Sequence, residues 1–294
     1  MPCSLTPVQH SWLVKRPRWF FTDPPYDVPI DGHVSGLGKT QHREFAMASG
    51  EMTPVQFTTF LETAFRNMAA HSADGSIHFI CMDWRHMGEM LDAGEKVYSE
   101  FKNLIVWAKD NGGMGTFCRS RHELIFAFKS GTAPHINSFE LGQHGRYRTN
   151  VWQYKGMNTL KPGRMDELAL HPTVKPVAMI ADTIKDVSQR NGIVLDLFGS
   201  SGSTLIAAHN TGRQAYICEL DPIYCDRIIR RWEAYAKDDA VRAHTGETFA
   251  GTKAERSRMA PPIDHKTSTG PNDRWAKMDF AGPEIMASTR TSQE

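Results

Sequence analysis

The chain has 294 residues, of which 40% are hydrophobic and 23% charged, a composition typical of one large or two smaller globular α/β domains. No apolar run approaches the roughly 18 residues of a membrane span, and the N-terminus lacks the charged-then-apolar build of a signal peptide. We therefore expect neither secretion nor membrane insertion. The 34 Lys and Arg residues against 33 Asp and Glu leave a net charge of +1, which gives no argument for a nucleic-acid partner.

The cysteines and histidines do not follow the spacing of a metal site. The five cysteines include no C-x-x-C pair, and the 13 histidines form no H-E-x-x-H or similar pattern. Cys81 and Cys218 fall within apolar runs, which indicates buried thiols in a reducing compartment. The sequence predicts no metal.

The first half of the chain predicts several strands with helices between them. Residues 19–22 indicate a short strand that ends at two prolines, which can neither continue a sheet ladder nor lie inside a helix. Thr53 and Pro54 predict the start of a helix, because apolar residues then recur at helical spacing. Three further strands are expected at 76–82, 102–109 and 122–129, with a helix within 83–99 and a Gly112-Gly113 connection between the last two strands.

The second half alternates helix and strand more regularly. The expected order is a helix over 176–189, a strand over 193–198, a helix over 203–210, a strand over 214–220 and a helix over 222–237. Such alternation implies a parallel sheet wound with helices. Residues 130–170 carry little regular signal. From residue 249 onward the chain is rich in Pro, Ser, Thr and Lys, which predicts a disordered tail.

A glycine-containing turn, DLFGSSGS at 196–203, lies between an expected strand and an expected helix. Glycines let the backbone bend sharply there and approach a ligand closely. The turn has neither the pattern of a P-loop nor the G-x-G-x-x-G of dinucleotide-binding proteins. Glu219 ends the next strand about twenty residues later, where an acidic side chain can accept both hydroxyls of a ribose. Alone, the glycine turn is as typical of an ordinary turn as of a ligand-binding one, and Glu219 alone is more typical of a solvated strand end.

The strand over 19–22 leads into Asp23-Pro24-Pro25-Tyr26. The two prolines fix the turn, so the Asp23 carboxylate and the Pro24 carbonyl can point into one cavity beside the Tyr26 ring. Two acceptors next to an aromatic face suit the exocyclic amino group of a base, whose two protons would bond to the acceptors while the base stacks on Tyr26. A proline turn with a capping aspartate is the alternative.

The chain resembles the amino-group DNA methyltransferases that use S-adenosylmethionine, through TDPPY at 22–26, HPTVKP at 171–176, LDLFGSSGST at 195–204 and CELDP at 218–222. The resemblance spans about residues 19–248. The DPPY element precedes the glycine turn with a basic segment between them, as in the permuted β-class of these enzymes. The resemblance implies an α/β fold with a doubly wound, mostly parallel sheet of the class I methyltransferase type and a small irregular target-recognition insertion.

The resemblance also assigns roles to individual residues. The catalytic motif that grips a flipped base would consist of Asp23, Pro24, Pro25 and Tyr26. S-adenosylmethionine would be bound by Asp196, Phe198, Gly199, Ser201, Gly202, Ser203, Glu219, Asp221, His171, Thr173 and Lys175. Lys175 would pair with the methionine carboxylate, with a surface lysine as the alternative. DNA would be bound by Arg146, Arg148, Lys155, Lys161 and Arg164.

The implied organisation is a variable N-terminal segment (1–18), a catalytic half (19–130), a target-recognition segment (131–170), a cofactor-binding half (171–248) and the tail (249–294). Residues 102–175 hold eleven Lys and Arg against five Asp and Glu, which favours phosphate contact near the recognition segment, with a solvated basic face as the alternative. Family members commonly have a strand with a Gly-Asp pair before the DPPY strand, and residues 1–18 show none. The segment 240–249, with Gly246-Glu247, can supply that strand, unless the sequence is a piece of a longer chain.

The expected reaction is direct in-line transfer of the methyl group to N6 of adenine, on a base flipped out of a specific double-stranded DNA sequence. An aspartate first in the motif resembles the adenine enzymes more often, and N4 of cytosine is the alternative acceptor. A catalytically impaired DNA-binding relative and a nucleotide-binding enzyme acting on a small molecule also stay open. We expect a cytoplasmic protein of bacterial or phage origin. A homodimer and a cognate restriction endonuclease stay open as partners.

Overall fold

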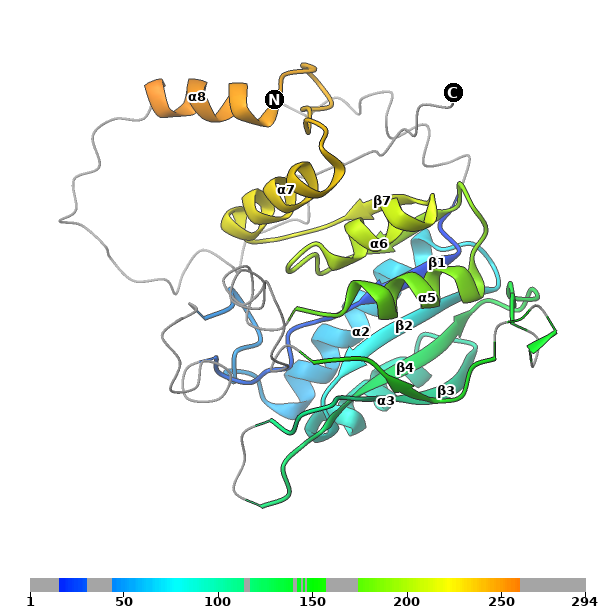
Figure 1. Cartoon of the computed structure of the whole chain (residues 1–294). Coiled ribbons are helices and arrows are strands. Elements are labelled where there is room, and N and C mark those ends of the chain that lie inside the picture. The colour runs from blue at the N-terminus through cyan, green and yellow to red at the C-terminus, as the bar shows by residue number, and fades with distance from the viewer. Residues whose placement is uncertain are drawn as a thin grey trace.

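The computed structural model describes residues 16–30, 44–113, 117–139, 142–143, 145, 147–156 and 174–259. Within them lies a seven-stranded sheet with the strand order β5-β3-β4-β2-β1-β6-β7 (Figure 1). The first half of the described chain contains β1 (Trp19–Thr22), α2 (Pro54–His71), β2 (Ser76–Met82), η1 (Trp84–His86), α3 (Met87–Glu95), β3 (Glu100–Ala108) and β4 (His122–Ser130). The second half contains β5 (Val151–Gln153), α5 (Val177–Val187), β6 (Ile193–Asp196), α6 (Ser203–Thr211), β7 (Gln214–Ile217), α7 (Pro222–Ala236) and α8 (Phe249–Met259).

Helices cover both faces of the sheet, and strand β1 shows how its residues divide between the two cores. Trp19 and Phe21 pack with the apolar sides of α5, α6 and α7, whereas Phe20 packs with those of α2 and α3. Successive side chains of a strand point to opposite faces, so a fully apolar strand buried on both sides is expected here. This is the doubly wound arrangement that the sequence predicts.

The parallel strands bring the two sequence motifs to one edge of the sheet. Strand β1 runs parallel to both β2 and β6, and β6 runs parallel to β7. The carboxyl ends of β1 and β6 therefore lie side by side, and the DPPY turn and the glycine turn both leave the sheet there. The Thr22 hydroxyl at the end of β1 donates a 2.9 Å hydrogen bond to Asp196 at the end of β6, which joins the two strand ends directly.

Several helices and strands have boundaries close to those expected from the sequence. Strand β2 has the expected bounds, and the two strands expected on either side of Gly112-Gly113, β3 and β4, form an antiparallel pair. Helix α2 begins with a capping box, in which the Gln56 backbone N–H donates to the Thr53 hydroxyl and Pro54 occupies the first turn. None of the helices in the described part of the chain is both long and apolar enough to cross a membrane.

Two expectations about the end of the chain were wrong. Residues 249–259 form helix α8 and are not part of a disordered tail. The segment 240–249 does not supply a sheet strand, because its pairing is limited to an isolated antiparallel bridge between Val241 and Thr248. The Gly246 backbone N–H donates to the Arg242 carbonyl, so this segment folds back on itself in a tight turn.

Candidate active site

The Asp23 carboxylate lies at the centre of the site, with both of its oxygens engaged. Oδ1 accepts a 2.7 Å hydrogen bond from the Tyr26 hydroxyl, and Oδ2 lies 2.6 Å from the Lys175 ammonium. Burial raises the pKa of Asp23, while the Lys175 charge acts in the opposite direction. The DPPY turn therefore presents a carboxylate that is held in one orientation and is largely shielded from water.

Lys175 is a buried member of a charged cluster, so the alternative of a surface lysine was wrong. Its side chain is 5% exposed, and its ammonium also lies 3.1 Å from Glu123 Oε2. Glu123 in turn forms an ion pair with Lys109. Burial alone would lower the pKa of Lys175, but the carboxylates of Asp23 and Glu123 raise it well above its ordinary value. Lys175 thus pairs with two protein carboxylates, and its expected contact with a methionine carboxylate stays a prediction.

The glycine turn has a backbone that only small residues can adopt at two positions. A Cβ on Gly199 would lie 2.4 Å from the Ile217 side chain, and Gly202 has a φ of +75° directly before helix α6. Ser200 between them is also left-handed, with a φ of 53°, and its backbone N–H donates a 2.7 Å hydrogen bond to Glu219. Gly202 supplies no side-chain cap, so the N-terminus of α6 keeps backbone N–H groups for a ligand.

Asp196 is buried at the base of this turn and is satisfied entirely by neighbouring donors. Its carboxylate accepts hydrogen bonds from the hydroxyls of Thr22 and Thr204 and from the Phe198 backbone N–H. Burial nevertheless raises the pKa of Asp196 from 3.8 to about 7. The carboxylate fixes the turn, and its charge is costly in this position.

The two motifs, more than 170 residues apart in the chain, line one pocket of about 240 Å³. Its lining consists of Phe21, Asp23, Lys175, Ile180, Asp196, Phe198, Gly199, Ser200, Ser201, Ser203 and Thr204. The structure thus brings together Asp23 and most of the residues expected to bind the cofactor. Among the described residues, no group of three or more His, Cys, Asp or Glu side chains could hold a metal ion.

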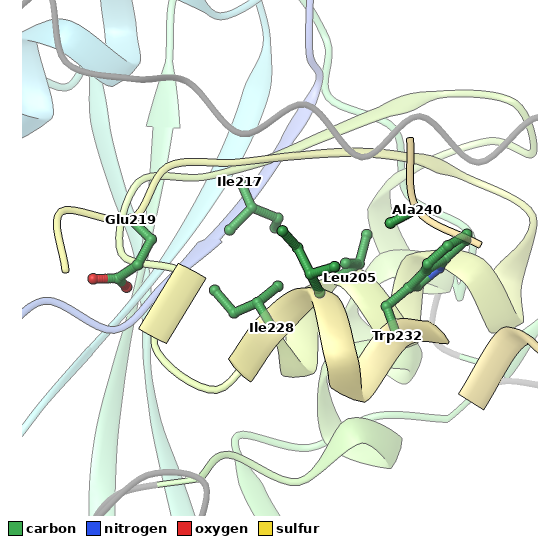
Figure 2. Close-up of a pocket in the computed structure, with 7 residues that line it drawn as sticks. Leu205, Ile217, Glu219, Ile228, Trp232 and Ala240 are labelled. Atoms are coloured by element: carbon green, nitrogen blue, oxygen red, sulfur yellow. The ribbon is translucent and has the colours of Figure 1, made fainter. Parts of the chain in front are cut away.

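Glu219 contacts the glycine turn but does not line this pocket. Its Oε1 accepts from the Asp221 backbone N–H at 2.9 Å and its Oε2 from Ser200. It borders a second, mostly apolar pocket of about 350 Å³ between β7, α6 and α7, and Figure 2 shows its carboxylate directed away from the apolar side chains. Asp221 is 6% exposed and accepts from the Ile223 backbone N–H, so it caps helix α7. That cap is a structural role that the sequence interpretation did not consider.

Two residues of the site have no counterpart in the sequence interpretation. Arg231 on α7 donates to the Ser201 carbonyl at 2.8 Å and to the Ser203 hydroxyl at 3.0 Å, which fixes the serine-rich half of the turn. Glu123 supports Lys175 from strand β4. A lone arginine on an amphipathic helix gives no signal in a sequence. Glu123, however, is the second residue of an expected strand beside a basic loop, and a charged residue near a strand end is a signal that could have identified it.

One residue expected to contact DNA, Arg148, is engaged within the protein. The Arg148 side chain is 15% exposed, lies 3.0 Å from the Asp186 carboxylate of α5, and stacks 4.2 Å from the Trp152 ring centroid. It joins β5 to α5 and does not present a free charge to a phosphate. Lys155 is exposed, as a DNA contact requires. Five other expected site residues lie outside the described part of the chain: Arg146, Lys161, Arg164, His171 and Thr173.

Comparison with known proteins agrees with this geometry. A family model described as DNA methylase, of the N6/N4 type, matches residues 18–230. The type II methyltransferase M.ScaI of Streptomyces caespitosus is 33% identical over 93 residues, which cover 32% of this chain and 31% of that protein. The DNA adenine methyltransferase YhdJ of Escherichia coli (strain K12) is 30% identical over 120 residues, covering 40% of this chain and 39% of that protein. The alignments thus span well under half the length of these relatives.

Two solved structures show the same fold. The cytosine-N4-specific PvuII DNA methyltransferase has a TM-score of 0.55 at 11% identity, over 75% of this chain and 82% of that chain. The M1.HpyAVI–SAM complex has a TM-score of 0.51 at 17% identity, over 76% of this chain and 92% of that chain. The sheet is therefore of the class I methyltransferase type. The match over residues 18–230 places this chain in the N6/N4 DNA methylase family.

Proposed function

We propose that this protein transfers a methyl group from S-adenosylmethionine to N6 of adenine in a specific sequence of double-stranded DNA. The observation that carries the proposal is that Asp23 and the glycine turn line one and the same pocket. The family match supports an amino group of DNA as the acceptor, and the order of the two motifs supports a β-class arrangement. The aspartate of the DPPY element and the adenine enzyme among the relatives both favour adenine.

The donors and acceptors of the site fit S-adenosylmethionine. Each oxygen of Glu219 accepts one backbone N–H and keeps lone-pair capacity for one more donor, which suits the two ribose hydroxyls. The uncapped N-terminus of α6 suits the carboxylate of the methionine part. The residues that would surround the cofactor are Asp196, Phe198, Gly199, Ser201, Gly202, Ser203 and Glu219, with His171 and Thr173 completing the pocket.

When bound, S-adenosylmethionine supplies an electrophilic methyl group. The protein's contribution is to orient the acceptor nitrogen and to remove its proton. Asp23 and the Pro24 carbonyl would each accept a hydrogen bond from one amino N–H, and the Tyr26 ring would stack on the flipped base. Hydrogen bonding in this direction keeps the nitrogen lone pair available for the methyl group. The nitrogen gains a methyl group and loses one proton, and the buried Asp23 carboxylate is the acceptor within reach.

The DNA contacts are proposed for the target-recognition segment. Lys155 is exposed on it, and Arg146, Lys161 and Arg164 would add positive charge near the phosphates. The type II name of M.ScaI supports a cognate restriction endonuclease as a functional partner.

The test is methyl transfer to unmethylated bacterial DNA, followed by nucleoside analysis of the product. With the methyl group of the cofactor labelled, we expect labelled N6-methyladenine; with the adenosine part labelled instead, we expect no label in the DNA. Label in N4-methylcytosine would overturn the choice of base. A protein that binds the cofactor but transfers no methyl group to any DNA would overturn the proposed activity.

A further inference from the structure

Glu123 is a partly buried carboxylate beside the reacting groups that has no part in the reaction proposed above. It is the second residue of β4, and its side chain is 16% exposed. Oε2 lies 3.1 Å from the Lys175 ammonium and accepts a 3.3 Å hydrogen bond from the Tyr26 hydroxyl. Oε1 forms an ion pair with Lys109 at the end of β3. Glu123 does not line the pocket, so it would act through the groups that do.

We propose that Glu123 is a positioning residue for methyl transfer: it shares the Lys175 ammonium with Asp23 and leaves the Asp23 carboxylate able to take the amino proton. This inference rests on the proposed function, because it concerns the same site. How strongly Asp23 holds a proton is, however, a property of the protein itself, which can be measured without methyl transfer.

The distances show that Asp23 and Glu123 share the Lys175 ammonium. Lys175 lies 2.6 Å from Asp23 and 3.1 Å from Glu123, so one positive charge serves two carboxylates. If the ammonium served Asp23 alone in this shielded site, it would favour the ionised form strongly and make Asp23 a poor proton acceptor. The second carboxylate opposes that effect by its like charge. The Tyr26 hydroxyl has one proton and lies closer to Asp23 Oδ1, at 2.7 Å, than to Glu123 Oε2, at 3.3 Å, so Glu123 is a weaker, competing acceptor for it.

The other charged and titratable groups around Asp23 do not replace this role. Burial raises the pKa of Asp23 most, Lys175 lowers it, and the Glu123 charge raises it. The ammoniums of Lys175 and Lys109 outweigh burial and lower the pKa of Glu123 to about 2, so Glu123 stays ionised throughout a neutral pH range. Burial also raises the pKa of Cys81 on β2 well above its usual range, so this thiol stays neutral.

Asp196 on β6 also interacts electrostatically with Asp23, and burial raises the pKa of Asp196 to about 7. It lies at the base of the glycine turn, so its protonation would affect cofactor binding first. Measurements of kcat at saturating cofactor therefore separate the titration of Asp23 from that of Asp196.

The decisive variant is Glu123→Gln, which keeps the shape and an oxygen for Lys175 but removes the negative charge. We expect the acidic limb of the kcat–pH profile to move to lower pH by about one unit and the plateau of kcat to fall about tenfold, with cofactor affinity unchanged within about twofold. Lys175→Met should move the limb in the opposite direction. The matched control is Glu100→Gln, which removes an exposed ion pair with Lys102 from the same hairpin and should leave the profile unchanged.

A second measurement does not need activity. Carboxyl ¹³C NMR titration of the full chain, with Asp23→Asn to assign the signal, should show a lower pKa for Asp23 in Glu123→Gln than in the wild type. An unchanged or raised pKa of Asp23, or a lower kcat plateau with an unmoved acidic limb, would show that Glu123 only stabilises the fold. A wild-type protein without transferase activity would instead overturn the proposed function, and the NMR result would still decide the role of Glu123.

Discussion

Replacing Asp196 by asparagine should stabilise the protein at alkaline pH, although Asp196 accepts three hydrogen bonds. The carboxylate is 4% exposed, and burial raises its pKa from 3.8 to about 7. A group that binds its proton more tightly in the folded state lowers stability as pH rises between the unfolded and folded pKa values. The destabilisation therefore begins near pH 4 and is complete slightly above pH 7.

The size of the effect follows from 1.36 kcal/mol for each pH unit over which the two states differ in proton binding. The whole interval corresponds to about 4 kcal/mol, and the part between pH 5 and pH 8 to about 3 kcal/mol. An asparagine at this position cannot ionise, so the variant escapes this loss. Its amide oxygen can accept from Thr22 and Phe198 as Oδ1 does now, and its amide nitrogen can donate to the Thr204 hydroxyl.

Urea unfolding of the full chain at pH 5, 6, 7 and 8 measures the difference in unfolding free energy between Asp196→Asn and wild type. We expect that difference to change by about 3 kcal/mol in favour of the variant between pH 5 and pH 8. The matched control is Asp226→Asn, which removes an exposed carboxylate paired with Arg230 on α7 and should show no such trend. A difference that stays constant with pH, or that moves toward the wild type, would refute the reasoning.

Two further substitutions separate structural from cofactor-binding charges. Arg148→Ala should lower the free energy of unfolding by about 3–5 kcal/mol, because the buried Asp186 carboxylate loses its ion pair. Thermal unfolding measures this loss. An unchanged Tm together with weakened DNA binding would instead assign Arg148 to a phosphate contact. Glu219→Gln should weaken the binding of S-adenosylmethionine about 10- to 100-fold in calorimetric titration, because the proposed charged acceptor of the two ribose hydroxyls is lost. The control Glu62→Gln on α2 should leave the affinity unchanged. Equal affinities of Glu219→Gln and the wild type would show that Glu219 does not bind the cofactor.

Local patterns were enough to predict most of the elements. Strand β2 is a continuous apolar run, and helix α2 follows a capping residue and a proline, so both could be located before any tertiary contact was known. The meeting of the DPPY and glycine turns also follows from sequence, because parallel strands end at the same edge of a sheet. The order of the two motifs is read directly from the sequence, and its interpretation as a β-class arrangement depends on the resemblance to a known family.

The charges of the site could not be predicted in the same way. A lysine next to a proline gives no sign that it will be buried between Asp23 and Glu123, which lie about 150 and 50 residues away in the chain. Arg148 contributes to the same local charge excess whether it faces solvent or pairs with Asp186. Net charge by segment counts side chains but does not show which of them pack inward. Only tertiary structure separates the two cases.

The central claim is that the DPPY turn acts on the acceptor while the glycine turn holds the cofactor. The most direct test measures cofactor binding and methyl transfer in the same preparation of Asp23→Ala. We predict that binding of S-adenosylmethionine stays within a few-fold of the wild type and that transfer to DNA falls below detection. An Asp23→Ala protein that still methylates DNA at a rate near that of the wild type would contradict the account.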